Sequence, residues 1–143
     1  MKKVVKFGGS SLADAKQFQK VGAIVHADPS RIYVVPSAPG KRFSGDTKVT
    51  DLLYRCYDLA ADGKDFTDPF REIQSRYNEI IQGLGLKYSL EDEFRAIEEK
   101  LKKEPNRDYT ASRGEYLNGR VMAKYLGFTF VDAAEIIFFD QDG

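Results

Sequence analysis

Two short apolar runs open the chain and flank a segment with helical periodicity. Residues 3–7 and 31–35 are rich in β-branched and aromatic side chains, as is typical of strands covered on both faces. Between these runs, apolar or small residues recur at intervals of three and four, at Phe18, Val21, Gly22 and Val25. That spacing predicts a helix, and the whole segment predicts a β-α-β unit with two parallel strands.

Four further helices are expected. An apolar stripe over 49–60 includes Cys56, and a second helix is predicted to begin at Asp68-Pro69 and to end near Gly83 to Gly85. A third helix is expected from Ser89, with Asp92 completing a partial capping box, and the fourth spans about 108–126. We expect these helices to form a lobe beside the sheet.

The end of the sequence returns to strand-like composition. Residues 128–131 predict a third strand, and residues 136–139 form a further apolar run. The final residues, 140–143, resemble the start of a calcium loop, but the spacing is short and we interpret them as a plain turn.

The composition bounds the class of protein. With 143 residues, 42% hydrophobic and 31% charged, the chain has the size and balance of one globular α/β domain. Its 22 basic and 22 acidic residues cancel, which disfavours nucleic acid and anionic membrane surfaces as partners. No apolar stretch is long enough to span a bilayer, so we expect a cytoplasmic protein.

One cysteine and one histidine limit the chemistry further. Cys56 lies on an apolar stripe and is expected to be a buried structural thiol, and His26 is expected at a surface or a helix end. A disulfide framework, a cysteine zinc site and a multi-histidine metal site are all disfavoured, and we predict no protein metal site.

The residues after the first strand predict a phosphate site. Lys6 offers a point charge, and Gly8 and Gly9 let backbone N–H groups approach an anion, followed by the hydroxyls of Ser10 and Ser11. The spacing matches neither the Walker A pattern nor the dinucleotide fingerprint. The alternative is an ordinary turn in which Ser10 or Ser11 caps the next helix.

Small and polar residues also follow the second strand, at 36–40, and ligands of parallel sheets bind at the carboxyl ends of strands. The polar segment 41–48 is interpreted as a mobile loop over that site. Its cations Lys41, Arg42 and Lys48 are expected to be solvated rather than bound to ligand.

Three segments together resemble aspartate kinase. They are residues 6–11, residues 37–53 and the Ser-Arg-Gly-Glu run at 112–115. The first is typical of the wider amino acid kinase family, and the other two narrow the resemblance to aspartate kinase. The resemblance covers essentially all 143 residues, including 130–133.

The resemblance implies the N-terminal portion of a three-layer, parallel-sheet amino acid kinase fold with an added helical lobe. It implies phosphorylation of the side-chain carboxylate of L-aspartate by ATP, with Mg²⁺ held mainly through ATP. By resemblance, Lys6 is catalytic and lies near the transferring phosphoryl group. Gly8, Gly9 and Ser10 are implied, with Lys6, to contact phosphate.

The resemblance also implies that Ser37 and Thr50 bind aspartate and that Glu115 faces its ammonium group. Local sequence alone leaves other roles open. Ser112 and Glu115 have the spacing of a capping box, and Thr50 suits a helix N-cap or first turn.

We expect residues 1–143 to be the N-terminal part of a kinase domain, without the second half and the regulatory ACT domains, and inactive or nearly so alone. The parent protein is expected to be a homo-oligomer. Two alternatives stay open: a related kinase for glutamate, acetylglutamate or carbamate, and a noncatalytic module that binds aspartate or a partner chain.

Overall fold

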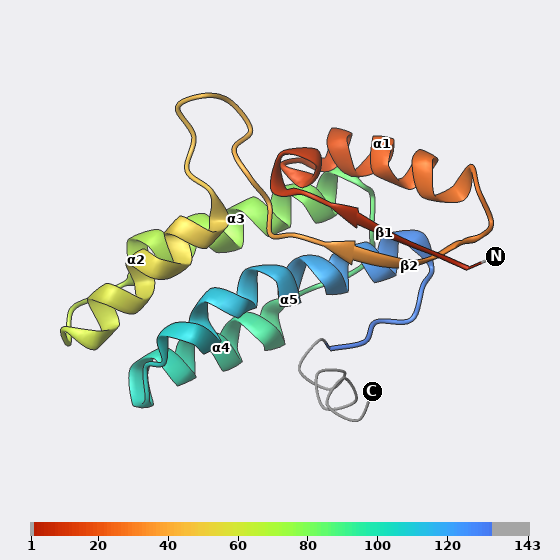
Figure 1. Cartoon of the computed structure of the whole chain (residues 1–143). Helices are drawn as coiled ribbons and strands as arrows, with labels where there is room; N and C mark the ends of the chain where they lie inside the picture. The colour runs from red at the N-terminus through yellow and green to blue at the C-terminus, as the bar shows by residue number, and fades with distance from the viewer. Residues whose placement is uncertain (1, 133–143) are drawn as a thin grey trace.

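The computed structural model describes residues 2–132, which form a two-stranded parallel sheet and five α-helices (Figure 1). The elements in chain order are β1 (Lys3–Phe7), the 3-10 turn η1 (Gly9–Leu12), α1 (Ala15–His26), β2 (Arg31–Pro36), α2 (Val49–Ala61), α3 (Thr67–Gly83), α4 (Glu91–Lys103) and α5 (Arg107–Leu126). The predicted β-α-β unit and the four later helices are confirmed.

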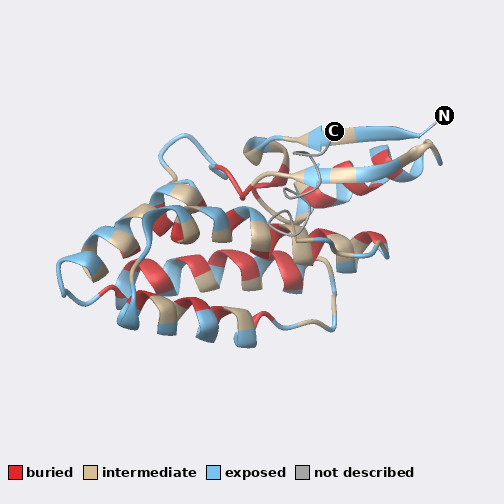
Figure 2. Cartoon of the chain, turned by 60° about the horizontal axis from the view of Figure 1, so that its bottom comes forward, coloured by how far each residue is buried: buried red, intermediate tan, exposed pale blue. Residues whose placement is uncertain are grey.

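The sheet has one covered face and one open face. Strands β1 and β2 pair in parallel, with Val5 opposite Val34 and Lys6 opposite Val35. Val5 and Val34 pack against the core, whereas Val35 is 46% exposed and Val4 is 67% exposed. Figure 2 shows the strands above the helices with their outer side uncovered by described residues. Burial on both faces, which the apolar runs predicted, is therefore wrong for residues 2–132.

Helix α1 begins at a cap that the sequence analysis did not identify. The carboxylate of Asp14 accepts a hydrogen bond of 2.9 Å from the N–H of Gln17, satisfying one donor of the first turn. Ser10 and Ser11 lie within η1 instead, so the alternative in which either of them caps this helix is wrong. His26 is the exposed last residue of α1, as predicted.

Helices α2 to α5 enclose a shared apolar core. Its largest fully buried side chains include Tyr77 and Phe94, and Cys56 is buried among them as expected. Helix α3 begins one residue before the predicted start, where Asp65 accepts hydrogen bonds from both the N–H and the hydroxyl of Thr67. At α4 the hydroxyl of Ser89 accepts from the N–H of Glu91 at 3.2 Å, in place of the predicted bond to Asp92.

Helix α5 is a single helix of 20 residues. The side chain of Asn106 caps its start by accepting from the N–H of Tyr109 at 2.8 Å, and Gly127 ends it with φ at 75°. Ser112 and Glu115 therefore lie inside the helix, and the capping-box interpretation of these residues is wrong.

Residues 128–132 do not form the predicted third strand. The ring of Phe130 packs edge-on against Tyr116 of α5, with centroids 5.6 Å apart. A strand needs a partner for its backbone groups, and this segment follows α5 instead. The apolar run 136–139 and the turn 140–143 lie outside the described residues.

Candidate functional site

The segments that follow β1 and β2 lie against each other. The N–H of Ser37 donates to the carbonyl of Phe7 at 3.0 Å, and the N–H of Gly40 donates to the carbonyl of Gly9 at 2.8 Å. These bonds extend the parallel pairing beyond the strands. They place the glycine turn beside the loop after β2, at the edge of the sheet where ligands of parallel sheets bind.

The backbones at Gly9 and Gly40 lie too close together to admit side chains. A Cβ on Gly9 would lie 2.9 Å from the carbonyl oxygen of Ala38, and a Cβ on Gly40 would lie 2.7 Å from the carbonyl carbon of Gly9. Neither glycine has a positive φ. The chain needs glycine at both positions because two backbones meet there, rather than because the turn is sharp.

Gly8 differs from Gly9 in its surroundings. A Cβ on Gly8 would meet no described atom within 4 Å, so the space beside its backbone is open. Gly8 and Ser10 are both exposed, and Lys6 is exposed on the outer face of the sheet. Within residues 2–132 the ammonium group of Lys6 forms no ion pair. Lys6, Gly8 and Ser10 are thus all accessible at the end of β1 and in the turn that follows it.

The middle of α5 brings the segments of the three expected aspartate ligands together. A Cβ on Gly114 would lie 2.8 Å from the Cβ of Ala38 and 3.7 Å from a methyl group of Val49. Ser37, Thr50 and Glu115 are the chain neighbours of these three residues. Ser37 and Thr50 are half-buried and Glu115 is exposed. Thr50 is the second residue of α2 and lies in its first turn, and the N-cap position is occupied by Lys48.

Asn118 is a buried polar residue at this site that sequence reasoning missed. Its Nδ2 donates to the carbonyl of Ser37 at 2.7 Å, which ties α5 to the end of β2. Its Oδ1 is buried and has no hydrogen-bond partner within residues 2–132. Its position in the sequence could have indicated a buried role, because Asn118 lies between the core residues Leu117 and Val121.

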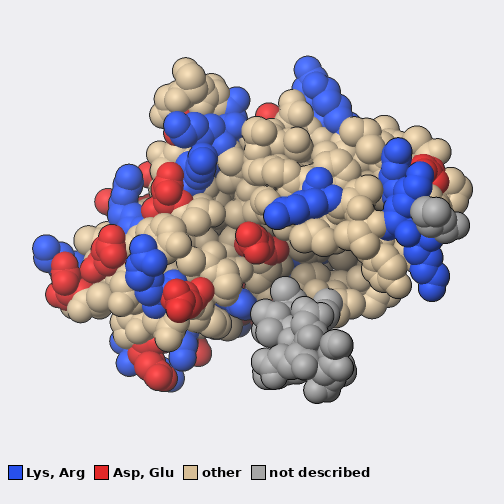
Figure 3. All heavy atoms as spheres, in the orientation of Figure 1, with Lys and Arg blue, Asp and Glu red and all other residues tan. Residues whose placement is uncertain are grey.

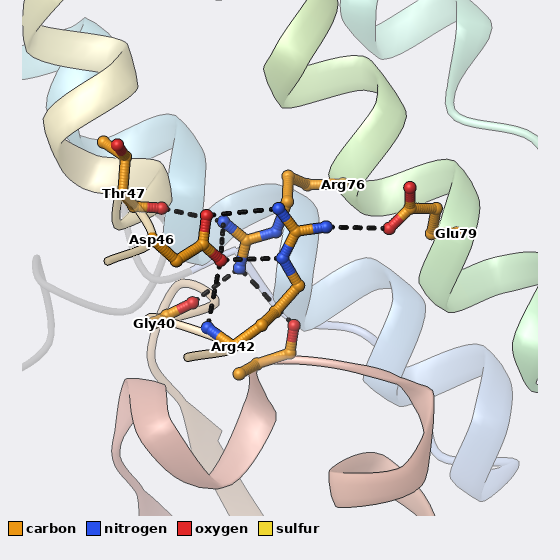
Figure 4. A network of polar contacts seen from close by, with 7 residues as sticks. Gly40, Arg42, Asp46, Thr47, Arg76 and Glu79 are labelled. Carbon is orange, nitrogen blue, oxygen red and sulfur yellow. Dashed lines mark hydrogen bonds and ion pairs between the residues drawn. The ribbon is translucent and has the colours of Figure 1, made fainter. Parts of the chain in front are cut away.

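Arg76 is the second residue that was missed. It is 4% exposed and donates to the carbonyls of Thr47 and Gly40, at 2.8 and 2.5 Å, from the buried side of α3 (Figure 4). Its position could also have indicated a buried role, since Arg76 lies three residues after Ile73 and next to Tyr77 on the apolar stripe.

The loop between β2 and α2 projects from the body of the molecule (Figure 1) and is joined to α3. Arg42 forms ion pairs with Asp46 at 2.7 Å and with Glu79 at 3.0 Å. The Arg42 guanidinium holds the pKa of the Asp46 carboxyl well below its usual range. Arg42 is therefore paired within the protein, whereas Lys41 and Lys48 are exposed.

No cluster of three carboxylate, histidine or cysteine side chains suited to a metal ion occurs in residues 2–132. The same residues contain no helix long and apolar enough to cross a membrane.

Comparison with known proteins supports the resemblance noted in the sequence. The amino acid kinase family matches over residues 1–143. "Aspartokinase 3" of Bacillus subtilis is 38% identical over 137 residues, which are 92% of this chain and 30% of that protein.

Solved structures agree. The crystal structure of Clostridium acetobutylicum aspartate kinase superposes with a TM-score of 0.89 at 47% identity, covering 93% of this chain and 31% of that one. E. coli aspartokinase III in complex with aspartate and ADP gives a TM-score of 0.68 at 24% identity, covering 89% of this chain and 29% of that one. The second likeness concerns the fold alone.

The chain thus spans 30% of the length of its curated relative. The expected α/β fold and the resemblance to aspartate kinase are confirmed by these matches. The chain belongs to the amino acid kinase family.

Proposed function

We propose that this chain forms the part of an aspartate kinase that binds L-aspartate and the phosphates of ATP. The observation that carries the proposal is the convergence of three segments: the turn after β1, the loop after β2, and α5 at Gly114. Relatives at 38% and 47% identity that are named aspartate kinases support L-aspartate as the substrate.

The reaction joins two anions. A side-chain carboxylate oxygen of aspartate attacks the γ-phosphorus of ATP, the bond from that phosphorus to the bridging oxygen breaks, and ADP leaves. Such a transfer needs positioning and charge stabilisation rather than a covalent nucleophile on the protein. Lys6 supplies the cation, and the open space beside Gly8 lets phosphate approach the backbone of Gly8, Gly9 and Ser10. We assign Mg²⁺ to the phosphates of ATP, because this ion is usually bound through substrate phosphates with few protein ligands.

L-Aspartate carries one ammonium and two carboxylate groups. We assign its ammonium to Glu115, and hydrogen bonds from the hydroxyls of Ser37 and Thr50 to its carboxylates. A ligand without the amine would leave the carboxylate of Glu115 without its counter-charge in the complex, which disfavours such ligands.

We further propose that residues 1–143 are the N-terminal part of a longer kinase domain, and that the remainder completes the nucleotide site. The chain alone is then inactive or nearly so. Its coverage of 30% of the curated relative is the basis for this proposal.

The test uses the complete polypeptide that carries this sequence. With ATP and L-aspartate it should form an acyl phosphate, trapped by hydroxylamine as the hydroxamate. Lys6→Ala should lower kcat far more than it raises KM for aspartate, and Glu115→Ala should chiefly raise that KM. The matched controls are Lys20→Ala and Glu99→Ala, both on exposed helix positions.

Each alternative has its own outcome. Phosphorylation of L-glutamate, acetylglutamate or carbamate in preference to L-aspartate would replace the substrate assignment. Binding of L-aspartate without ADP formation would indicate a noncatalytic module. Equal changes of kcat and KM in both variants would contradict the division of roles.

A further inference from the structure

The side chain of Arg76 reaches both segments of the candidate site from outside it. One terminal nitrogen donates to the carbonyl of Thr47 at 2.8 Å. The other donates to the carbonyls of Gly40 at 2.5 Å and Ala13 at 3.4 Å. Figure 4 shows this guanidinium between the loop and the turn, with its stem on α3. One side chain thus joins three backbone segments to one helix.

Burying a guanidinium is costly unless it is paired and hydrogen-bonded. Here the counter-charge is the carboxylate of Asp46, 3.6 Å away, which Arg42 also binds. The Nε of Arg76 is buried without a partner in the described part of the chain, so the pairing is incomplete. Burial accordingly lowers the pKa of Arg76. A side chain that only filled space on α3 would not need this charge.

The contacts of Arg76 continue into the candidate site through one peptide segment. Gly40 accepts from Arg76 through its carbonyl and donates to Gly9 through its N–H at 2.8 Å. The carbonyl of Thr47, which accepts from Arg76, lies two residues before the start of α2 and three residues before Thr50 in the sequence. The position of the glycine turn relative to the start of α2 is therefore set through Arg76.

We propose that Arg76 is a positioning residue for phosphoryl transfer, which aligns the phosphate-contacting turn with the aspartate-binding start of α2. The proposal rests on the proposed function. Arg76 touches neither substrate in this scheme, and it acts by fixing the backbone of Gly40 and Thr47. Lysine cannot replace it, because one ammonium lacks the planar fork that reaches both sides.

The test is steady-state kinetics of Arg76→Lys and Arg76→Ala in the complete polypeptide. Misplacement by about 1 Å can cost about 100-fold in rate, so we expect kcat to fall by about that factor. KM for L-aspartate should change less than about threefold, since Glu115, Ser37 and Thr50 remain. Millimolar methylguanidinium should restore part of the kcat of Arg76→Ala by occupying the vacated space. The matched control is Arg95→Ala, at a side chain that is 66% exposed on α4.

A kcat within about twofold of wild type for folded Arg76→Lys would overturn the proposal. So would a loss in Arg76→Ala that methylguanidinium does not relieve. If Arg76→Ala does not fold, Arg76→Lys decides by the same kcat criterion.

A second readout separates this proposal from the proposed function. Amide hydrogen exchange of residues 37–49 reports the Gly40 and Val49 N–H bonds directly, whatever reaction the protein catalyses. In Arg76→Lys we expect exchange in this segment to accelerate at least tenfold, with α4 unchanged. If the wild type does not phosphorylate aspartate but exchange is still faster in Arg76→Lys, the proposed reaction is rejected and the positioning role is kept. Unchanged exchange would overturn the positioning role itself.

Discussion

Asn118 shows how one amide fixes two elements at the candidate site. Asn118→Asp replaces the donor at Nδ2 by a carboxylate oxygen that faces the carbonyl of Ser37. We expect a loss of about 2 kcal/mol or more in the free energy of unfolding at pH 7, from a buried charge beside an acceptor. Burial raises the pKa of such a carboxyl, so the loss should shrink as the pH falls and the acid regains a donor.

Urea denaturation followed by circular dichroism at pH 7 and pH 4.5 measures both effects. The control is Gln82→Glu, the same amide-to-acid change at an exposed position of α3. Equal losses in the two variants at pH 7 would contradict the role given to Asn118.

Cys56 gives a prediction for alkaline pH. The thiol is fully buried, and burial raises its pKa from 9.0 to about 12. The unfolded thiol ionises near pH 9 while the folded thiol stays neutral. The buried thiol therefore contributes fully to folding stability below pH 9, and this contribution is lost as the pH rises toward 12. When the pH is raised from 8 to 10.5, the free energy of unfolding should fall further for the wild-type chain than for Cys56→Ala. Urea titrations of both proteins at the two pH values test this, and parallel losses would contradict it.

Residue types alone pointed to part of the candidate site and missed the rest. Lys6, Gly8 and Gly9 were recognisable because a cation and paired glycines after a strand suit an anion. Arg76 and Asn118 were not, since a polar residue within an apolar stripe does not reveal which distant carbonyl it meets. Their partners are 29 to 81 positions away in sequence.

At the scale of elements, the crossing of the turn after β1 and the loop after β2 depends on two glycines. Gly9→Ala and Gly40→Ala each place a Cβ less than 3.0 Å from backbone atoms. We expect each to lower the free energy of unfolding by about 1–3 kcal/mol, because backbone must shift to admit the methyl group. Chemical denaturation measures the change. The control is Gly45→Ala, where a Cβ would approach nothing closer than 3.9 Å, and a comparable loss there would refute the steric argument.

Helices were easier to predict than strands for a physical reason. The periodicity and end signals of α2 to α5 are local, and each of these four helices begins within two residues of its expected start. Strands depend on partners that local sequence does not contain. Residues 128–131 have strand-like composition, yet Phe130 packs on α5 and the segment pairs with neither strand. The capping signal at Ser112 failed likewise, because Asn106 begins the helix earlier.

At the scale of the molecule, the open side of the sheet should promote self-association of the isolated chain. Val4, Tyr33 and Val35 are 67, 52 and 46% exposed there. Figure 3 shows that this side is mostly tan, with basic side chains lying across it and at its margins. Exposed apolar surface of this kind favours contact between copies. Sedimentation of Val4→Thr/Tyr33→Thr should show a lower average mass than the wild type at equal concentration. The control is Ile24→Thr on α1, 47% exposed, and an equal decrease there would contradict the assignment to the sheet.

The sequence predicted the layers of the molecule but not this open face. Apolar runs such as residues 31–35 indicate strands that need cover, and do not say which segment supplies it.

The span of the Arg76 contacts has a consequence for the order of folding. The three carbonyls bound by its guanidinium lie 29, 36 and 63 positions away in sequence, whereas the hydrogen bonds inside each helix join residues four positions apart. Contacts between distant positions require more loop closure and form after local ones. We therefore expect the alignment of the candidate site to form after the individual helices and to be lost before them, so that a partly unfolded protein keeps most of its helix content.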